Sequence, residues 1–241
     1  MDELIRCTPA LTAGFLKNLQ LAGLCAVFSL ILGTILVAMR VTPSPVVRVA
    51  ATAYVNVLRN TPLTLVLAFT GVGLSDTLGL TFSSTPNTNS FWLVVLGLSA
   101  YTSAFVCEAL RSGINSVPLG QAEAARAIGL TFFQSLRLII LPQAFRSVVT
   151  PLGSVMIAMT KNTTVAIAAG YLAEVSFVMK DTFDTTGVSI PIFLGMVGAF
   201  MAVTLPIGFF AGWFARRLAV ERCARRREFC STRRGRTRGA A

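Results

Sequence analysis

Apolar residues fill this sequence in long stretches rather than in the short alternating patterns of a soluble domain. About 20 apolar residues are enough for a helix to cross the hydrocarbon core of a bilayer. Five stretches fit that requirement: Leu21–Met39, Ala50–Leu80, Phe91–Leu110, Ser147–Leu172 and Ile190–Phe214. The pattern therefore predicts an all-α integral membrane protein with about five transmembrane helices.

Polar residues interrupt two of these stretches. The sequence Arg59–Pro62 (RNTP) lies inside the second, where the proline should kink the helix and leave carbonyl groups free. The sequence Lys161–Thr164 (KNTT) lies inside the fourth. Ahead of the first stretch, residues 11–20 are expected either to lie on the membrane surface or to begin that span. Charged residues at 180–184 indicate a loop before the last span.

One polar segment with a helical pattern, Gln121–Pro142, lies between the third and fourth stretches. Its first half is rich in helix formers. Gly129 is suited to end that helix in a left-handed cap, and Thr131–Gln134 fits the capping box that starts a second helix. The second helix should end before Pro142. We expect two short helices joined at a glycine elbow, in a shape suited to docking a partner.

Composition agrees with a membrane protein. Hydrophobic residues make up 54% of the 241 residues and charged residues 13%, against about 25% charged in soluble domains. The chain has no histidine, which excludes imidazole catalysis and a histidine metal site. The spacing of its five cysteines suggests neither a disulfide framework nor a zinc site. We therefore expect no catalytic residue and no metal.

The distribution of charge predicts the orientation in the membrane. Arginines gather in segments 40–48 and 108–147 and in the tail 216–241, whereas loops 81–90 and 180–184 carry no net positive charge. With five spans the basic segments share one side, so the positive-inside rule places the amino terminus outside and the carboxyl terminus in the cytoplasm.

The same pattern divides the chain. Residues 1–215 are expected to form the transmembrane domain, with 113–142 as a cytoplasmic loop, and residues 216–241 a disordered basic tail. That tail holds ten arginines and two glutamates. It is expected to meet anionic lipid head groups rather than nucleic acid.

Polar residues inside the spans are candidates for a transport pathway. A charged side chain inside the bilayer costs free energy, so its presence there indicates a pathway or an ion pair. The candidates are Arg59, Asn60, Thr61, Lys161, Asn162 and Thr163. The alternatives are that Lys161 reaches the interface or pairs with Glu174, and that Arg59 lies at the cytoplasmic surface. Glu108 and Arg111 are three residues apart and are expected to form a structural ion pair.

The central segment resembles the EAA signature of the membrane subunits of bacterial ABC importers, through Glu123-Ala124-Ala125, Gly129 and Ile140-Leu141-Pro142. The run Arg59–Leu63 resembles the R-x-T-P-L sequence of the polar amino-acid permeases of the His/Glu/Gln type. Further similar segments are Arg111–Ile114, Gly120–Arg126, Leu141–Ala144, Pro151–Gly153 and Lys161–Thr164. The phrases LRNTPLTLV, LRSGINSV and TKNTT look especially like the glutamate-importer permeases of actinobacteria.

This resemblance implies the ABC type I importer permease fold, with an EAA coupling helix in a groove of the ATPase. The coupling residues would be Glu123, Ala124, Ala125, Gly129, Leu141 and Pro142. The implied partners are a second permease subunit (homologous or identical), two ATPase subunits and an extracellular solute-binding protein. ATP and magnesium would bind to the ATPase, because this chain has no G-x-x-x-x-G-K-[ST] loop. The chain itself would bind no cofactor and catalyse no reaction.

The expected function is import of a polar amino acid: glutamate, or the similar glutamine or aspartate. Two alternatives are an ion-gradient-driven secondary carrier and a membrane scaffold that transports nothing. No internal repeat is visible, which weighs against a carrier built from two related halves. Transport by the single purified chain without ATP would favour the carrier.

Overall fold

The computed structural model is helical and describes the backbone of residues 2–187 and 190–238, with side chains for most of residues 8–217. In chain order the elements are α1 (Asp2–Val41), α2 (Pro45–Asn60), α3 (Leu63–Ala68), η1 (Phe69–Thr77), α4 (Pro86–Asn115), α5 (Leu119–Ala127), α6 (Phe132–Ser135), η2 (Leu136–Ile140), α7 (Leu141–Asn162), η3 (Thr163–Ala169), α8 (Val175–Thr186) and α9 (Ile190–Arg238). The segments η1 and η2 are π-helices and η3 is a 3-10 helix. The all-α prediction is confirmed.

Four helical segments in the described part are long and apolar enough to cross a membrane, at 8–41, 86–115, 136–169 and 190–217. A fifth crossing exists only if α2 and the α3–η1 helix count together, and these two meet at an angle of 107°. The break falls at Thr61 and Pro62, where the proline has no N–H to continue the helix. The second span is therefore sharply broken, whereas the sequence predicted a kinked but continuous helix.

Two local expectations are settled by the helix bounds. Residues 11–20 lie inside α1, so they begin the first span and do not form a separate surface helix. Residues 180–184 lie inside α8, so the prediction of a loop there is wrong. The Glu174 side chain explains why a helix begins at Val175. Its carboxylate accepts hydrogen bonds from the backbone N–H groups of Ser176 and Phe177 and so caps α8.

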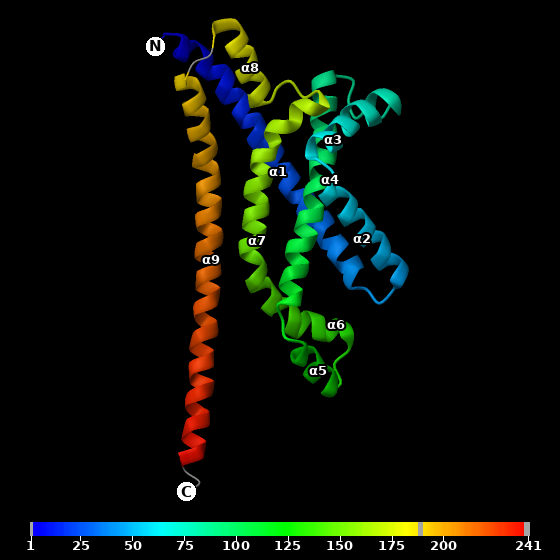
Figure 1. Ribbon diagram of the computed structural model, residues 1–241, viewed down its shortest axis with the longest axis vertical. Helices are drawn as coiled ribbons and strands as arrows, with labels where there is room; N and C mark the ends of the chain where they lie inside the picture. The colour runs from blue at the N-terminus through cyan, green and yellow to red at the C-terminus, as the bar shows by residue number, and fades with distance from the viewer. Residues whose placement is uncertain (1, 188–189, 239–241) are drawn as a thin grey trace.

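Helix α4 lies at the centre of the bundle, with α1 and α7 packed along it and α2 and α3 packed against it as well (Figure 1). One buried apolar cluster joins α1, α3, α4, α7 and η3, and a second joins α1, α2 and α4. Cys25 is buried in the first cluster and Cys107 in the second. Both cysteines are therefore core residues.

The elongated molecule has two distinct ends, shown at the top and bottom of Figure 1. The end with α8 and the N-terminus is called the α8 end here, and the end with α5 and α6 is called the α5 end. Helix α9 stands at the edge of the bundle, packs mainly on α7, and continues to Arg238. Side chains beyond Arg217 lie outside the described part, so the division at residue 215 and the disorder of the tail remain predictions.

Candidate functional site

The glycine elbow forms with the hydrogen bonds that its sequence predicts. Gly129 has a φ of +85° and follows the end of α5. The Leu130 N–H donates to the Ala125 carbonyl (3.1 Å) and the Gly129 N–H donates to the Arg126 carbonyl (3.0 Å). This pair of bonds is the Schellman motif, which requires a left-handed residue between helix and exit. The position therefore favours a residue that accepts the left-handed conformation, glycine first and asparagine next.

The second helix starts as predicted but does not end as predicted. The Thr131 N–H donates to Gln134 Oε1 (2.9 Å), and the Gln134 N–H donates to Thr131 Oγ1 (3.3 Å), which completes the capping box. Pro142 does not end the helix: it lies in the first turn of α7, where a missing N–H costs nothing. The π-helical segment η2 joins α6 directly to α7, so the elbow is continuous with a membrane-crossing helix.

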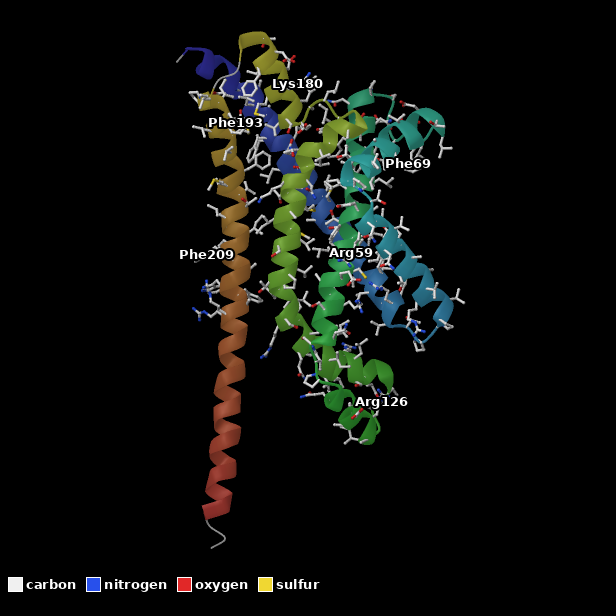
Figure 2. All side chains as sticks on the ribbon, viewed as in Figure 1. Arg59, Phe69, Arg126, Lys180, Phe193 and Phe209 are labelled. Atoms are coloured by element: carbon white, nitrogen blue, oxygen red, sulfur yellow. The ribbon has the colours of Figure 1, made fainter. Side chains whose placement is uncertain are left out.

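The elbow presents an exposed surface at the α5 end, where Figure 2 labels Arg126. Glu123, Ala124 and Gly129 are exposed, and the Ile128 side chain is 76% exposed. Ala125 faces inward and is buried. Gln143 on α7 donates to Gln121 Oε1 on α5 (2.7 Å), which holds the elbow against the start of α7. The elbow is thus an exposed corner that carries one large apolar side chain, Ile128.

Arg59 belongs to a charge cluster around Glu108, which we call the Glu108 cluster. Its members are Glu108 and the guanidinium groups of Arg40, Arg59 and Arg111. Glu108 bonds directly to Arg40, and its oxygens lie 3.7 Å from Arg59 Nη1 and 3.3 Å from Arg111 Nη2. The predicted Glu108–Arg111 pair is confirmed, but the sequence did not indicate that the ends of α1 and α2 would join it.

The side chains of the other two polar candidates in the second span form hydrogen bonds with backbone carbonyls of α2. Asn60 Nδ2 donates to the Asn56 carbonyl (2.7 Å), and Thr61 Oγ1 donates to the Val57 carbonyl (2.8 Å). Both residues lie next to the break between α2 and α3, and these bonds satisfy carbonyls at the end of α2. Their part in a transport pathway remains a prediction.

The three candidates where α7 meets η3 point in three directions. Lys161 borders a cavity between α7, α8 and α9. Asn162 borders a different cavity, between α4 and α7. Thr163 is fully buried and accepts a hydrogen bond from Asn18 Nδ2 (3.2 Å). Consecutive helical residues are about 100° apart around the axis, so a run of polar residues cannot line one surface.

The α4–α7 cavity has a volume of about 330 Å³ and mixes polar and aromatic side chains. It is lined by Tyr101, Thr102, Phe105, Ser154, Val155, Ala158, Met159 and Asn162. The Arg59 guanidinium carbon lies 5.8 Å from the centre of the Phe105 ring, so a cation stands beside this cavity. Asn162 thus lines this cavity and Arg59 lies beside its residue Phe105, whereas Lys161 borders a different cavity.

Sequence reasoning missed the α4 residues and Ser154 of this cavity. A signal was present, because Ser154, Ala158 and Asn162 follow one another at four-residue spacing on one helix face, as do Tyr101 and Phe105. Nothing in the sequence indicated that these two faces would meet.

A buried polar network surrounds Thr163 and was also missed. Asn18 Nδ2 donates to Glu174 Oε2 (3.4 Å) as well as to Thr163, and the Val175 N–H donates to Asn18 Oδ1 (3.0 Å). Each of these side chains is at most 2% exposed. The network fastens α1 to η3 and α8, because a buried polar group must find partners within the protein. Lys161 is not the partner of Glu174 that the sequence offered as an alternative.

Burial raises the pKa of Glu174 above its ordinary value of 4.5. The protonated carboxyl therefore favours the folded state, and this contribution is lost as the pH rises through the folded-state pKa. The Glu174→Gln variant carries a neutral side chain at every pH, so it does not lose this contribution as the wild type does. The melting midpoint of the variant minus that of the wild type should therefore become more positive between pH 4.5 and neutral pH. Asp181→Asn on α8 is the control for removing an exposed acid, and a Glu174→Gln difference that is constant with pH would contradict the prediction.

The family described as "Binding-protein-dependent transport system inner membrane component" matches residues 19–220. The glutamate transport system permease protein GluC of Corynebacterium efficiens is 47% identical over 220 residues, which cover 89% of this chain and 96% of GluC. The glutamate/aspartate import permease protein GltK of Escherichia coli is 32% identical, over 90% of this chain and 97% of GltK.

Solved structures agree in fold. A crystal structure of an amino acid ABC transporter with histidines contains a chain that superposes with a TM-score of 0.79 at 26% identity, covering 89% of this chain and 96% of that one. The inward-facing methionine transporter MetNI gives a TM-score of 0.70 at 18% identity. The ABC type I importer permease fold expected from the sequence is confirmed.

Proposed function

We propose, because this chain belongs to the family of binding-protein-dependent transport system inner membrane components, that it is the permease subunit through which glutamate enters the cell. The chain is a multi-pass membrane protein of an amino-acid transport system. Two glutamate permeases are among its relatives, at 47% and 45% identity over nearly their full length, and this supports glutamate over other polar amino acids.

The observation that carries the proposal is the rigid glycine elbow exposed at the α5 end and continuous with α7. A cytoplasmic ATPase that binds this elbow and changes conformation can move the connected spanning helix as a rigid body. A self-contained carrier needs no exposed docking surface at the end of a spanning helix. We place the α5 end and residues 216–241 in the cytoplasm and the N-terminus outside, in accordance with the arginine distribution.

Permeases of a transport system work with partner subunits. We propose a second permease subunit, two ATPase subunits that bind ATP and magnesium, and an extracellular protein that delivers glutamate. Glu123, Ala124, Ile128 and Gly129 supply the exposed surface for the ATPase. ATP-driven closure of the ATPase pair then moves the elbows, and the spans alternate between outward-facing and inward-facing states.

The α4–α7 cavity is the proposed site on the glutamate path. Its hydroxyl and amide groups, from Tyr101, Thr102, Ser154 and Asn162, are suited to hydrogen-bond a carboxylate and an ammonium group. The Arg59 guanidinium beside Phe105 adds a positive charge for an acidic amino acid.

Asn162→Leu tests this site, because it removes the amide from the cavity without touching the Glu108 cluster. We expect ATP-dependent glutamate uptake into vesicles carrying the assembled transporter to fall about tenfold, as for loss of a hydrogen bond to a charged group. Thr150→Val on the exposed face of α7 is the matched control and should keep wild-type uptake. Unchanged uptake by an assembled Asn162→Leu transporter would remove the cavity from the path.

The alternative of an ion-gradient-driven carrier makes an opposite prediction. Vesicles containing only this chain should take up glutamate without ATP if the carrier model holds, and should take up none under the proposal.

A further inference from the structure

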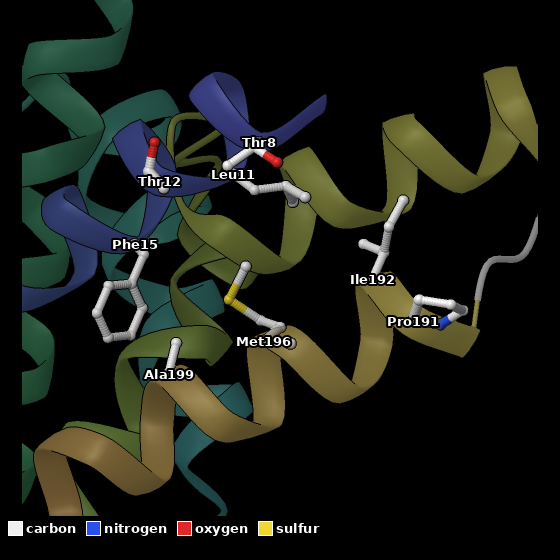
Figure 3. Close-up of a pocket in the computed structure, with 9 residues that line it drawn as sticks. Thr8, Leu11, Thr12, Phe15, Pro191, Ile192, Met196 and Ala199 are labelled. Atoms are coloured by element: carbon white, nitrogen blue, oxygen red, sulfur yellow. The ribbon is translucent and has the colours of Figure 1, made fainter. Parts of the chain in front are cut away.

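Two cavities flank α9 near the α8 end. The larger, about 510 Å³, lies between α7, α8 and α9, and the smaller, about 240 Å³, lies between α1 and α9. Figure 3 shows the smaller one, with Leu11 and Phe15 on α1 and Met196 and Ala199 on α9 around it. Met196 borders both cavities, so the two spaces adjoin.

Helix α9 contacts the bundle closely at separate points, and the two cavities lie beside these contacts. In the middle of α7, a Cβ on Gly153 would lie 2.5 Å from the Ala211 Cβ, so only glycine permits this approach. Nearer the α8 end, the rings of Phe15 and Phe200 pack edge to face, with their centroids 5.3 Å apart. Phe15 borders the smaller cavity and Phe200 the larger, so this aromatic contact stands between them.

The lining of the larger cavity is mostly apolar and flexible. It includes Met179, Met196 and Met201, with Phe193 and Leu205. Methionine side chains adapt to irregular apolar shapes. Such a lining suits a hydrocarbon chain and is poorly suited to a zwitterionic amino acid.

Lys161 gives this apolar cavity one cationic edge. It lies twenty residues after Leu141, the first residue of α7, and therefore about 30 Å away along the helix, which is the thickness of the hydrocarbon core. With Leu141 at the boundary on the α5 side, Lys161 would lie near the boundary on the α8 side, inside the apolar segment 136–169. Among the side chains that the structure describes, Lys161 makes no ion pair, since Asp184 pairs with Lys180 (3.4 Å) and Glu174 is bound by Asn18.

We propose that the cavity between α7, α8 and α9 binds an acyl chain of an anionic phospholipid, whose phosphate lies against Lys161. The bilayer supplies both groups at this depth, a phosphate at the boundary and hydrocarbon below it. The smaller cavity continues the apolar surface beyond Met196 and gives room for the rest of the lipid.

The test is native mass spectrometry of the detergent-purified full chain with the subunits that accompany it. The probes are phosphatidylglycerol and phosphatidylcholine with identical acyl chains. We expect Lys161→Gln to lower the preference for phosphatidylglycerol over phosphatidylcholine about fivefold relative to the wild type, because one lysine near the phosphate has been lost while the arginine tail is the same in both proteins. Met201→Trp fills the cavity and should reduce binding of both lipids.

Lys180→Gln is the matched control, because it removes a cation from the same end that already has an acidic partner. It should keep the preference for phosphatidylglycerol. The proposal is overturned if Lys161→Gln keeps the wild-type preference, or if Lys180→Gln loses it equally. It is also overturned if added glutamate displaces the lipid in wild type but not in Lys161→Gln. Lys161→Gln changes no packed residue, so the result does not depend on whether Met201→Trp folds, and lipid binding is read separately from glutamate uptake.

Discussion

Gly129→Val should abolish coupled glutamate uptake while the permease still reaches the membrane. The φ of +85° at this position is a left-handed conformation that costs an L-residue about 1–2 kcal/mol, and a β-branched residue is strongly disfavoured there. The elbow should leave its Schellman geometry, and Ile128 and Glu123 should no longer present one surface. We expect uptake to fall at least about tenfold and the ATPase activity of the complex to become independent of substrate.

Two variants separate this effect from a general loss of stability. Gly79 also has a positive φ (+67°), and at both glycines an added Cβ would meet no atom within 4 Å, so Gly79→Val carries a similar strain in a loop at the α8 end. It should keep coupled uptake. Asparagine tolerates the left-handed conformation, so Gly129→Asn should keep most of the coupled uptake. Loss of uptake in Gly79→Val to the same extent would show that strain alone, and not the elbow, is responsible.

Glu108→Gln should lower the thermal stability of the protein more than removal of any surface ion pair. The carboxylate pairs with three arginines, and the Arg40 side chain is only 10% exposed and that of Glu108 21%. Removing the carboxylate leaves the nearly buried Arg40 guanidinium without its partner, which costs about 2–4 kcal/mol after allowance for the partial exposure of Glu108, Arg59 and Arg111. We expect the melting midpoint in detergent to fall by about 5–10 °C.

Asp184→Asn is the control for the loss of one carboxylate. Its pair with Lys180 is i,i+4 on α8, and both side chains are about two-thirds exposed. Such a pair contributes less than about 0.5 kcal/mol, so the midpoint should barely change. Equal shifts for the two variants would mean that the Glu108 cluster does not tie α1, α2 and α4 together.

Local features of this chain were predictable in detail because their partners lie within a few residues. The Schellman bonds at Gly129 and the capping box at Thr131 use backbone groups at most five residues apart. The apolar stretches also predicted the spanning helices, since length and hydropathy alone decide whether a helix can cross. The expected end before Pro142 failed because a proline in the first turn of a helix is harmless.

Residue identity and spacing by themselves determined the helical membrane fold, the elbow and the resemblance to amino-acid importers. Only the tertiary structure decided which polar residues share a site. Asn18 meets Thr163 across 145 residues, Arg40 meets Glu108 across 68, and Asn162 faces α4 while Lys161 faces α9. These contacts depend on the rotation and separation of packed helices, which follow from the shapes of all the side chains between them rather than from any local pattern.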